Sequence, residues 1–155
     1  MPKSEILKTI SSPSEGLFKE KGSRFISYLY PVKDEEEIRQ LLVQVRKEHH
    51  SARHHCYAWR TGSEVFHSRS SDDGEPSGTA GKPILGQITA NNLTHVLIIV
   101  VRYFGGILLG TGGLVQAYKS AAADAIEKGN LIPFEPEFRI TVTFGYGHLN
   151  QVYQI

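Results

Sequence analysis

The chain has 155 residues, a hydrophobic content of 40% and a formal net charge of +1 at neutral pH. This size and composition fit one domain with a real core, and the near-neutral charge excludes a protein that is basic throughout, so nucleic acid would meet only a local patch. The lone Cys56 excludes an internal disulfide and a metal site built only from cysteines. No segment resembles a secretory signal or a membrane span, which makes the cytoplasm the expected location and a membrane an unexpected partner.

The N-terminal part predicts three strands and a helix. Residues 5–10 and 15–22 are short β-like segments separated by a Ser-Ser-Pro-Ser turn, and residues 23–32 read as a strand with apolar or aromatic side chains on both faces. A capping-box pattern followed by apolar residues at helical spacing then predicts a helix over residues 35–48.

A basic, histidine-rich segment follows at residues 46–60. Its second half alternates as a strand, with Cys56 and Ala58 on one face and bulkier side chains on the other. In the ordinary interpretation the histidines are solvated, and their spacing does not match a zinc site, so no metal is expected. In the functional interpretation the segment binds RNA or an acidic protein partner. The candidate binding residues here are Arg53, His54, His55 and Arg60.

Residues 64–69 are expected to form the second arm of a hairpin, and residues 70–83 a loop rich in Gly, Pro, Ser and carboxylates. An arginine at the end of an apolar strand needs a partner where it is desolvated. We therefore expect the loop acids to pair with Arg102 or Lys82 and to anchor the loop on the sheet. These acids are Asp72, Asp73 and Glu75.

The same loop admits a second interpretation, in which it serves a nucleotide- or phosphate-binding enzyme. The three acids would then hold Mg²⁺ near Lys82. A Walker A motif is not complete, because Pro76 stands where a glycine is required and Pro83 follows Lys82 in place of Ser or Thr.

The centre of the chain is an apolar, β-branched run at residues 96–101, which predicts a strand buried on both faces. A helix that begins at residue 82 or 83 and ends near residue 91 precedes it. A glycine-rich turn and an amphipathic helix over residues 114–128 follow, and residues 138–144 alternate as a last strand before the first turn of another helix.

The glycine-rich turn exposes backbone N–H groups near a helix start, which favours an anion. It lacks a strict dinucleotide-binding pattern. The candidate ligand-binding residues around it are Lys82, Arg102, Gly105, Gly106, Gly110, Gly112 and Gly113.

Three motifs resemble the IMPACT/YigZ family: Cys-Tyr-Ala at 56–58, SDDGEPSGTAGKPIL at 71–85 and VVRYFGGILLGTGGLVQAY at 100–118. The resemblance covers about residues 23–129. It implies an α+β fold like domain 2 of ribosomal protein S5, with a mixed or antiparallel sheet and helices on one face. Kinases of related fold hold a phosphate at a glycine turn that falls here on residues 110–113, although the paired serines of those loops are absent.

The resemblance also divides the chain. Residues 1–133 correspond to the N-terminal domain of the family, and residues 134–155 to a remnant or the beginning of a ferredoxin-like C-terminal domain. Eukaryotic relatives regulate translation by binding the ribosome-associated activator of a starvation-responsive kinase.

The favoured function is a non-enzymatic binding protein linked to translation regulation, without cofactor or catalytic residues, which contacts RNA, the ribosome or an acidic protein partner. No nucleophile and base are spaced as a catalytic pair. Two alternatives stay open: the phosphate-binding enzyme, and a purely structural role for the loop and strand motifs. The sequence leaves the oligomeric state undefined.

Overall fold

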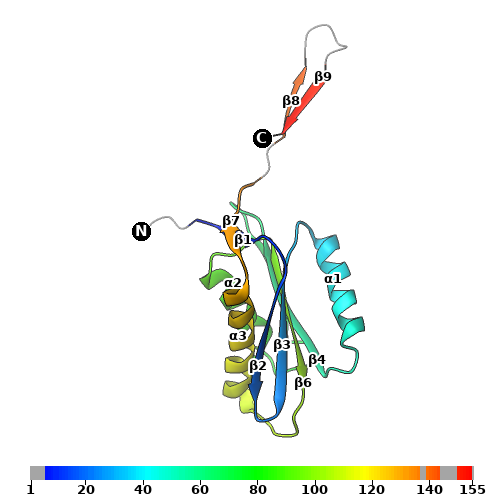
Figure 1. The fold of residues 1–155 in the computed structure, drawn as a ribbon, viewed down its shortest axis with the longest axis vertical. Helices are drawn as coiled ribbons and strands as arrows, with labels where there is room; N and C mark the ends of the chain where they lie inside the picture. Colours follow the sequence, from blue (N-terminus) through cyan, green and yellow to red (C-terminus); the bar gives the residue numbers. More distant parts are fainter. Residues whose placement is uncertain (1–5, 137–138, 144–149, 155) are drawn as a thin grey trace.

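The structure, a computed structural model, describes residues 6–136, 139–143 and 150–154. Its centre is a five-stranded sheet in the order β2-β3-β6-β4-β5, in which every neighbouring pair is antiparallel. Figure 1 labels β2, β3, β6 and β4 of this sheet. The α+β class with an antiparallel sheet, and the likeness to domain 2 of ribosomal protein S5, are thereby confirmed. The strands are β2 (Ser14–Glu20), β3 (Ser23–Pro31), β4 (His54–Thr61), β5 (His67–Ser71) and β6 (Val96–Tyr103).

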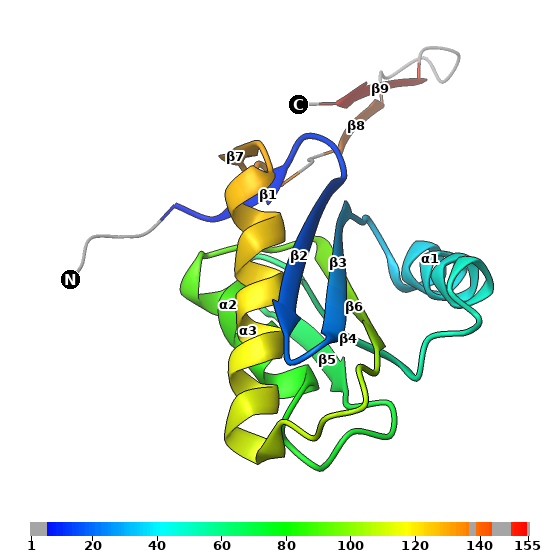
Figure 2. The ribbon, with the colours of Figure 1, turned by 60° about the horizontal axis from the view of Figure 1, so that its bottom comes forward.

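The apolar run at residues 96–101 is the buried centre of β6, as expected, and each of its residues is 0% exposed. Helices cover both faces of the sheet. Alternate residues such as Ile98 and Val100 pack against α2 (Gly81–Ala90) and α3 (Gly110–Lys128), while Leu97, Ile99 and Val101 face α1 (Glu35–Glu48), which lies on the opposite side (Figure 2).

The expectation that the helices lie on one face is therefore wrong for α1. A central strand that is apolar at every position leaves no face for water, so each face needs its own cover. The helix itself begins and ends as predicted. Asp34 accepts a hydrogen bond from the Glu37 N–H (2.9 Å), and the Glu37 carboxylate accepts one from the Lys33 N–H (2.9 Å).

The other predicted elements differ from the structure mainly at their ends. The second hairpin arm, β5, begins at His67, because the connection from β4 first turns at Gly62, which has a φ of 102°. The last helix begins at Gly110, so the glycines at residues 110–113 belong to its first turn and not to a preceding loop.

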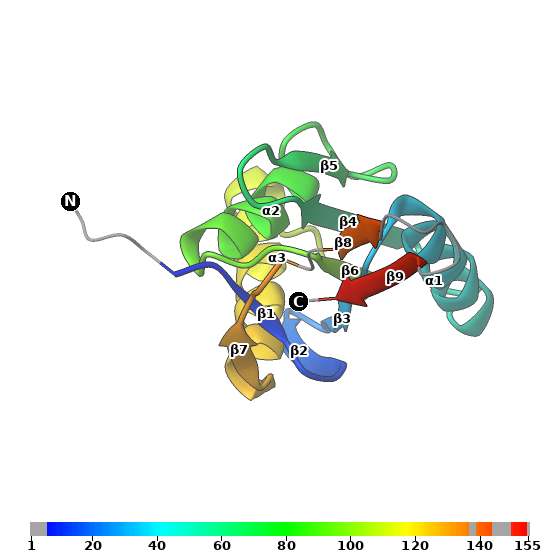
Figure 3. The ribbon, with the colours of Figure 1, turned by 90° about the horizontal axis from the view of Figure 1, so that it is seen from above.

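Two short two-stranded sheets complete the chain. Strand β1 (Lys8–Ile10) pairs with β7 (Leu131–Pro133), and β8 (Arg139–Thr143) pairs with β9 (Asn150–Gln154), as seen from above in Figure 3. The strand expected over residues 138–144 is confirmed for 139–143. The helical turn expected after it is wrong for residues 150–154, and residues 144–149 lie outside the described residues.

Across the parts of the chain that the structure describes, no helix is both long and apolar enough to cross a membrane.

Candidate functional site

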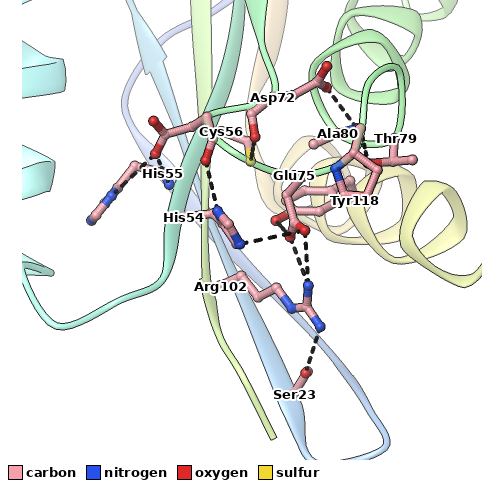
Figure 4. Close-up of polar contacts among 12 residues, drawn as sticks. Ser23, His54, His55, Cys56, Asp72, Glu75, Thr79, Ala80, Arg102 and Tyr118 are labelled. Carbon is pink, nitrogen blue, oxygen red and sulfur yellow. Dashed lines mark hydrogen bonds and ion pairs between the residues drawn. The ribbon is translucent and has the colours of Figure 1, made fainter. Parts of the chain in front are cut away.

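The side chain of Arg102 is held inside the protein at the end of β6. It is 7% exposed, its Nη1 donates to both carboxylate oxygens of Glu75 (2.9 and 3.1 Å), and its Nη2 donates to Ser23 Oγ (3.4 Å) (Figure 4). Its Nε has no hydrogen-bond partner among the described residues, and the guanidinium lies near the rings of Phe25 and Phe104 (5.4 and 5.5 Å). Glu75 thus makes the expected ion pair and ties the loop to the sheet.

Glu75 is the hub of a buried polar cluster. Its carboxylate is 3% exposed and accepts a short hydrogen bond from Tyr118 Oη (2.5 Å), while His54 Nε2 lies 3.6 Å away. Burial raises the pKa of Tyr118 far above its ordinary value, so the phenol stays protonated and donates. We call Glu75, Arg102, Tyr118, His54 and Ser23 the Glu75 cluster. Each of these five residues contacts another protein group, and Arg102 Nε is the atom left without a hydrogen-bond partner among the described residues.

Asp72 shapes the loop through the backbone. Its carboxylate accepts hydrogen bonds from the N–H groups of Gly78 (2.9 Å), Ala80 (3.1 Å) and Gly81 (2.9 Å), and so satisfies the start of α2. Partial burial alone would raise the pKa of Asp72, but these N–H groups, helped by the charge of Lys82, outweigh it and hold the pKa below its ordinary value. The α2 N-terminus is thereby closed by the protein's own acid.

Asp73 binds to β4 and does not pair with Arg102 on β6. Its Oδ2 accepts from the His55 N–H (2.7 Å), its carbonyl accepts from His54 Nδ1 (2.8 Å), and Arg46 lies 3.8 Å from Oδ1. The expected pairing of Asp72 and Asp73 with Arg102 or Lys82 is therefore wrong; Lys82 is exposed.

The loop acids do not converge on one point. Within the described ranges, no group of three or more His, Cys, Asp or Glu side chains is arranged to hold a metal ion. Cys56 donates its thiol hydrogen to the Asp72 carbonyl (3.0 Å), and burial raises its pKa, so it stays a thiol.

The basic segment does not form one surface. His54 points into the Glu75 cluster, whereas His55 lies on the α1 side, where Nε2 donates to the His49 carbonyl (2.7 Å); the interpretation that both are solvated is wrong. Arg60 lies at the far end of β4, donates to the Leu93 carbonyl (2.9 Å) and covers the ring of Phe66. The structure thus separates Arg60 from the other candidates.

The glycine-rich turn packs on the β2–β3 turn. Gly105 donates its N–H to Ser23 Oγ (3.1 Å), and a Cβ added at Gly105 would lie 2.1 Å from the carbonyl carbon of Gly22. Beyond this contact the loop turns outward between Gly106 and Gly110, whose φ angles are 90° and 77°. The glycines at 110, 112 and 113 follow as the first turn of α3, which has no side-chain cap.

Exposed cations gather around this contact. Arg53 donates its N–H to the Arg102 carbonyl and stacks its guanidinium over Phe104 (4.6 Å), while Arg24 pairs in register with Tyr103 and covers its ring (4.8 Å). We call the exposed cations Lys19, Lys21, Arg24 and Arg53 the basic end. Sequence reasoning found only Arg53, because the other three reach this place through the pairing of β2 with β3 and of β3 with β6.

A second group that sequence reasoning missed lies on the α1 side of the sheet. His49 Nε2 bonds Tyr28 Oη and its Nδ1 bonds Tyr103 Oη, each at 2.6 Å. Burial lowers the pKa of His49, with His55 and Arg24 acting in the same direction and Glu48 and Glu15 opposing, so the ring is neutral near pH 7. Burial, with the charge of Glu15, raises the pKa of Tyr28 to about 12.

These bonds predict a loss of stability in mild acid. The pKa of His49 in the folded protein is below the ordinary 6.5, so the unfolded chain takes up a proton at a higher pH than the folded protein does. The free energy of unfolding therefore falls as the pH drops below about 6.5. Urea titrations at about pH 7.5 and pH 5.5 would measure this. The variant His49→Gln should lose less stability between the two pH values; an equal loss in both proteins would assign the effect to other groups.

Comparison with known proteins identifies the family. The family model of the Impact N-terminal domain matches residues 21–126. The IMPACT family member of Haemophilus influenzae is 41% identical over 142 residues, which are 87% of this chain and 66% of that protein. The IMPACT family member YigZ of Escherichia coli K12 is 46% identical over 110 residues, 70% of this chain and 54% of that protein.

Structure comparison agrees. A crystal structure of a hypothetical protein superposes with a TM-score of 0.79 at 38% identity, covering 92% of this chain and 71% of the other. The chain spans roughly half to two thirds of the length of the curated relatives named above. The match includes the β2–β3 turn, the Glu75 loop and the glycine-rich turn, and on this evidence the chain belongs to the Impact N-terminal domain family.

Proposed function

We propose that the protein is a non-catalytic binding module linked to translation regulation, and that it contacts RNA, the ribosome or an acidic protein partner through the basic end and the neighbouring glycine-rich turn. The link to translation rests on family membership, since eukaryotic IMPACT proteins regulate translation. A cytoplasmic location follows from such a role. Residues 134–155 are proposed to be a remnant or the beginning of a ferredoxin-like C-terminal domain.

The observation that carries the proposal is the distribution of charge. The four cations of the basic end are exposed and make no ion pair with any described residue, whereas the carboxylates of the nearby loop are each engaged by N–H groups or by Arg102. Exposed Glu20, between Lys19 and Lys21, offsets one of the four cations, and the remaining excess gives a local positive field on a chain of almost no net charge. Such a patch favours phosphates or carboxylates of a partner.

The same distribution weighs against the phosphate-binding enzyme. A metal or a phosphate at the loop would compete with the backbone bonds of Asp72 and with the buried pair of Glu75 and Arg102. Ser23 and Tyr118 of the Glu75 cluster are buried, the His54 side chain is 19% exposed, and the thiol of Cys56 and the phenol of Tyr118 are protonated. The site is built to hold the loop in place, which supports binding over catalysis.

Fluorescence anisotropy with labelled RNA tests the RNA form of the proposal. Between about 50 and 200 mM salt the association constant of the wild-type protein should fall steeply, because phosphate contacts release counterions. The double variant Lys21→Glu/Arg53→Glu should bind about 10-fold or more weakly and with a shallower salt dependence.

Arg39→Glu is the matched control, because Arg39 is also an exposed cation but lies on α1 and pairs with Glu36. It should leave RNA affinity nearly unchanged. An absence of RNA binding by the wild-type protein at low salt would reject RNA as the ligand, and an equal loss in the control would reject the basic end as the site.

A further inference from the structure

A continuous row of contacting aromatic groups runs across the α1 side of the sheet. The Arg24 guanidinium lies 4.8 Å from the centroid of the Tyr103 ring. The Tyr103 ring meets His49 edge-on (5.8 Å, 62°), His49 is tilted against Tyr28 (5.5 Å, 48°), and Tyr28 stacks on Tyr30 (6.3 Å, 14°). We call these five residues the aromatic row. They come from β3, β6 and the residue that ends α1, so only the folded protein assembles them.

The row is accessible from solvent. Helix α1 packs its buried residues Ile38 and Val45 over the sheet centre, and none of the helices in the described part of the chain lies over the half of this face formed by β2 and β3 (Figure 2). The four rings are partly exposed and Arg24 is exposed, and Leu17, which pairs with Ile26 on this face, is 43% exposed.

Hydrogen bonds hold two tyrosines of the row in place. The two 2.6 Å bonds of His49 tie the hydroxyls of Tyr28 and Tyr103, so these two rings are positioned before any ligand arrives. A ligand that stacks on fixed rings does not have to order them, which reduces the entropic cost of binding.

We propose that the aromatic row is a stacking site for the bases of single-stranded RNA, whose phosphates lie on the basic end. This inference rests on the proposed function, and it adds that the RNA is single-stranded and that its bases bind at the aromatic row. Arg24 belongs to both features, so a strand can continue from one to the other. Bases stack on partly exposed aromatic side chains and on Arg, as in other sheet surfaces that bind single strands.

The charges differ along the row. Arg24 and Lys19 lie at the end near Tyr103, whereas Glu15 and Glu48 lie near Tyr28 and Tyr30, as their influence on both phenols shows. Carboxylates repel phosphates, so the phosphates are held at the Arg24 end, and a short run of bases next to them stacks on the tyrosines. A duplex has its bases already stacked on one another and offers none to the row.

The experiment compares an unstructured RNA of about 12 nucleotides with a duplex of the same length, both labelled. The wild-type protein should bind the single strand more tightly. Tyr30→Ala should weaken single-strand binding by about 5-fold or more, because one stacking partner is lost, while Tyr30→Phe should bind as the wild type does. Phe66→Ala is the matched control: this ring is 42% exposed and lies under Arg60, as Tyr103 of the row lies under Arg24, but it is at the β4–β5 connection.

Photocrosslinking with 5-iodouridine RNA reports on the site without a variant and should label Tyr28, Tyr30 or Tyr103. An equal affinity for the duplex, an unchanged affinity of Tyr30→Ala, or crosslinks only outside the row would overturn this inference while leaving RNA binding at the basic end intact. Failure of the wild-type protein to bind either RNA would reject RNA as the ligand altogether and leave the row to a protein contact.

Discussion

Glu75→Ala is expected to lower the free energy of unfolding by about 3–5 kcal/mol, which is a large share of the stability of a domain of this size. The substitution leaves the guanidinium of Arg102, 7% exposed, without the carboxylate that now accepts two of its hydrogen bonds. It also leaves the Tyr118 hydroxyl without its acceptor. Burying an unpaired charge costs far more than losing a surface ion pair. Urea titration followed by circular dichroism would measure the change.

A double variant distinguishes the effect of leaving the Arg102 charge unpaired from the effect of losing the packing of the Glu75 side chain. Removing both charges, as in Glu75→Leu/Arg102→Met, should recover much of the stability, because no unpaired ion then remains in the interior. Glu36→Ala, which breaks the exposed pair between Glu36 and Arg39, should change stability little. If Glu75→Ala were as mild as Glu36→Ala, the buried pair would not be what anchors the loop.

Elements whose signals are local could be predicted from the sequence. The apolar run of β6 and the cap of α1 at Asp34 depend on neighbouring residues, and both are found as expected. The side of the sheet on which α1 lies could not be predicted in the same way. It depends on which residues of β6 meet which helix. A strand that is apolar at every position has no alternation of polar and apolar residues to indicate which face a given helix covers.

The candidate site shows the same limit. The need of Arg102 for an acidic partner could be predicted from burial, but three acids in the loop were equivalent by composition, and only the fold selects Glu75. Asp72 and Asp73 turn to backbone N–H groups because the loop folds back on α2 and β4. Tyr118, separated from Glu75 by 43 positions, carries no signal in the sequence that would single it out from other helical aromatics.

Gly105→Ala is expected to lower the free energy of unfolding by about 1–3 kcal/mol and to weaken RNA binding as well. The added Cβ would lie 2.1 Å from the Gly22 carbonyl carbon and 2.4 Å from the Ser23 nitrogen. Both atoms are backbone, so the β2–β3 turn and the glycine-rich turn must separate. The hydrogen bond from the Gly105 N–H to Ser23 Oγ is then lost, and Lys21 moves away from Arg53.

The control is Gly112→Ala, in the first turn of α3, where an added Cβ meets nothing within 4 Å. Alanine is the better helix former, so this variant should be as stable as the wild type or more stable by up to about 1 kcal/mol, with RNA affinity unchanged. Thermal unfolding and anisotropy on both variants give the comparison. If Gly105→Ala behaved like Gly112→Ala, the two turns would not depend on their contact, and the basic end would be a set of independent cations. A loss confined to Gly105→Ala, in stability and in affinity together, would show that the close approach of two backbones is what arranges the cations that meet the ligand.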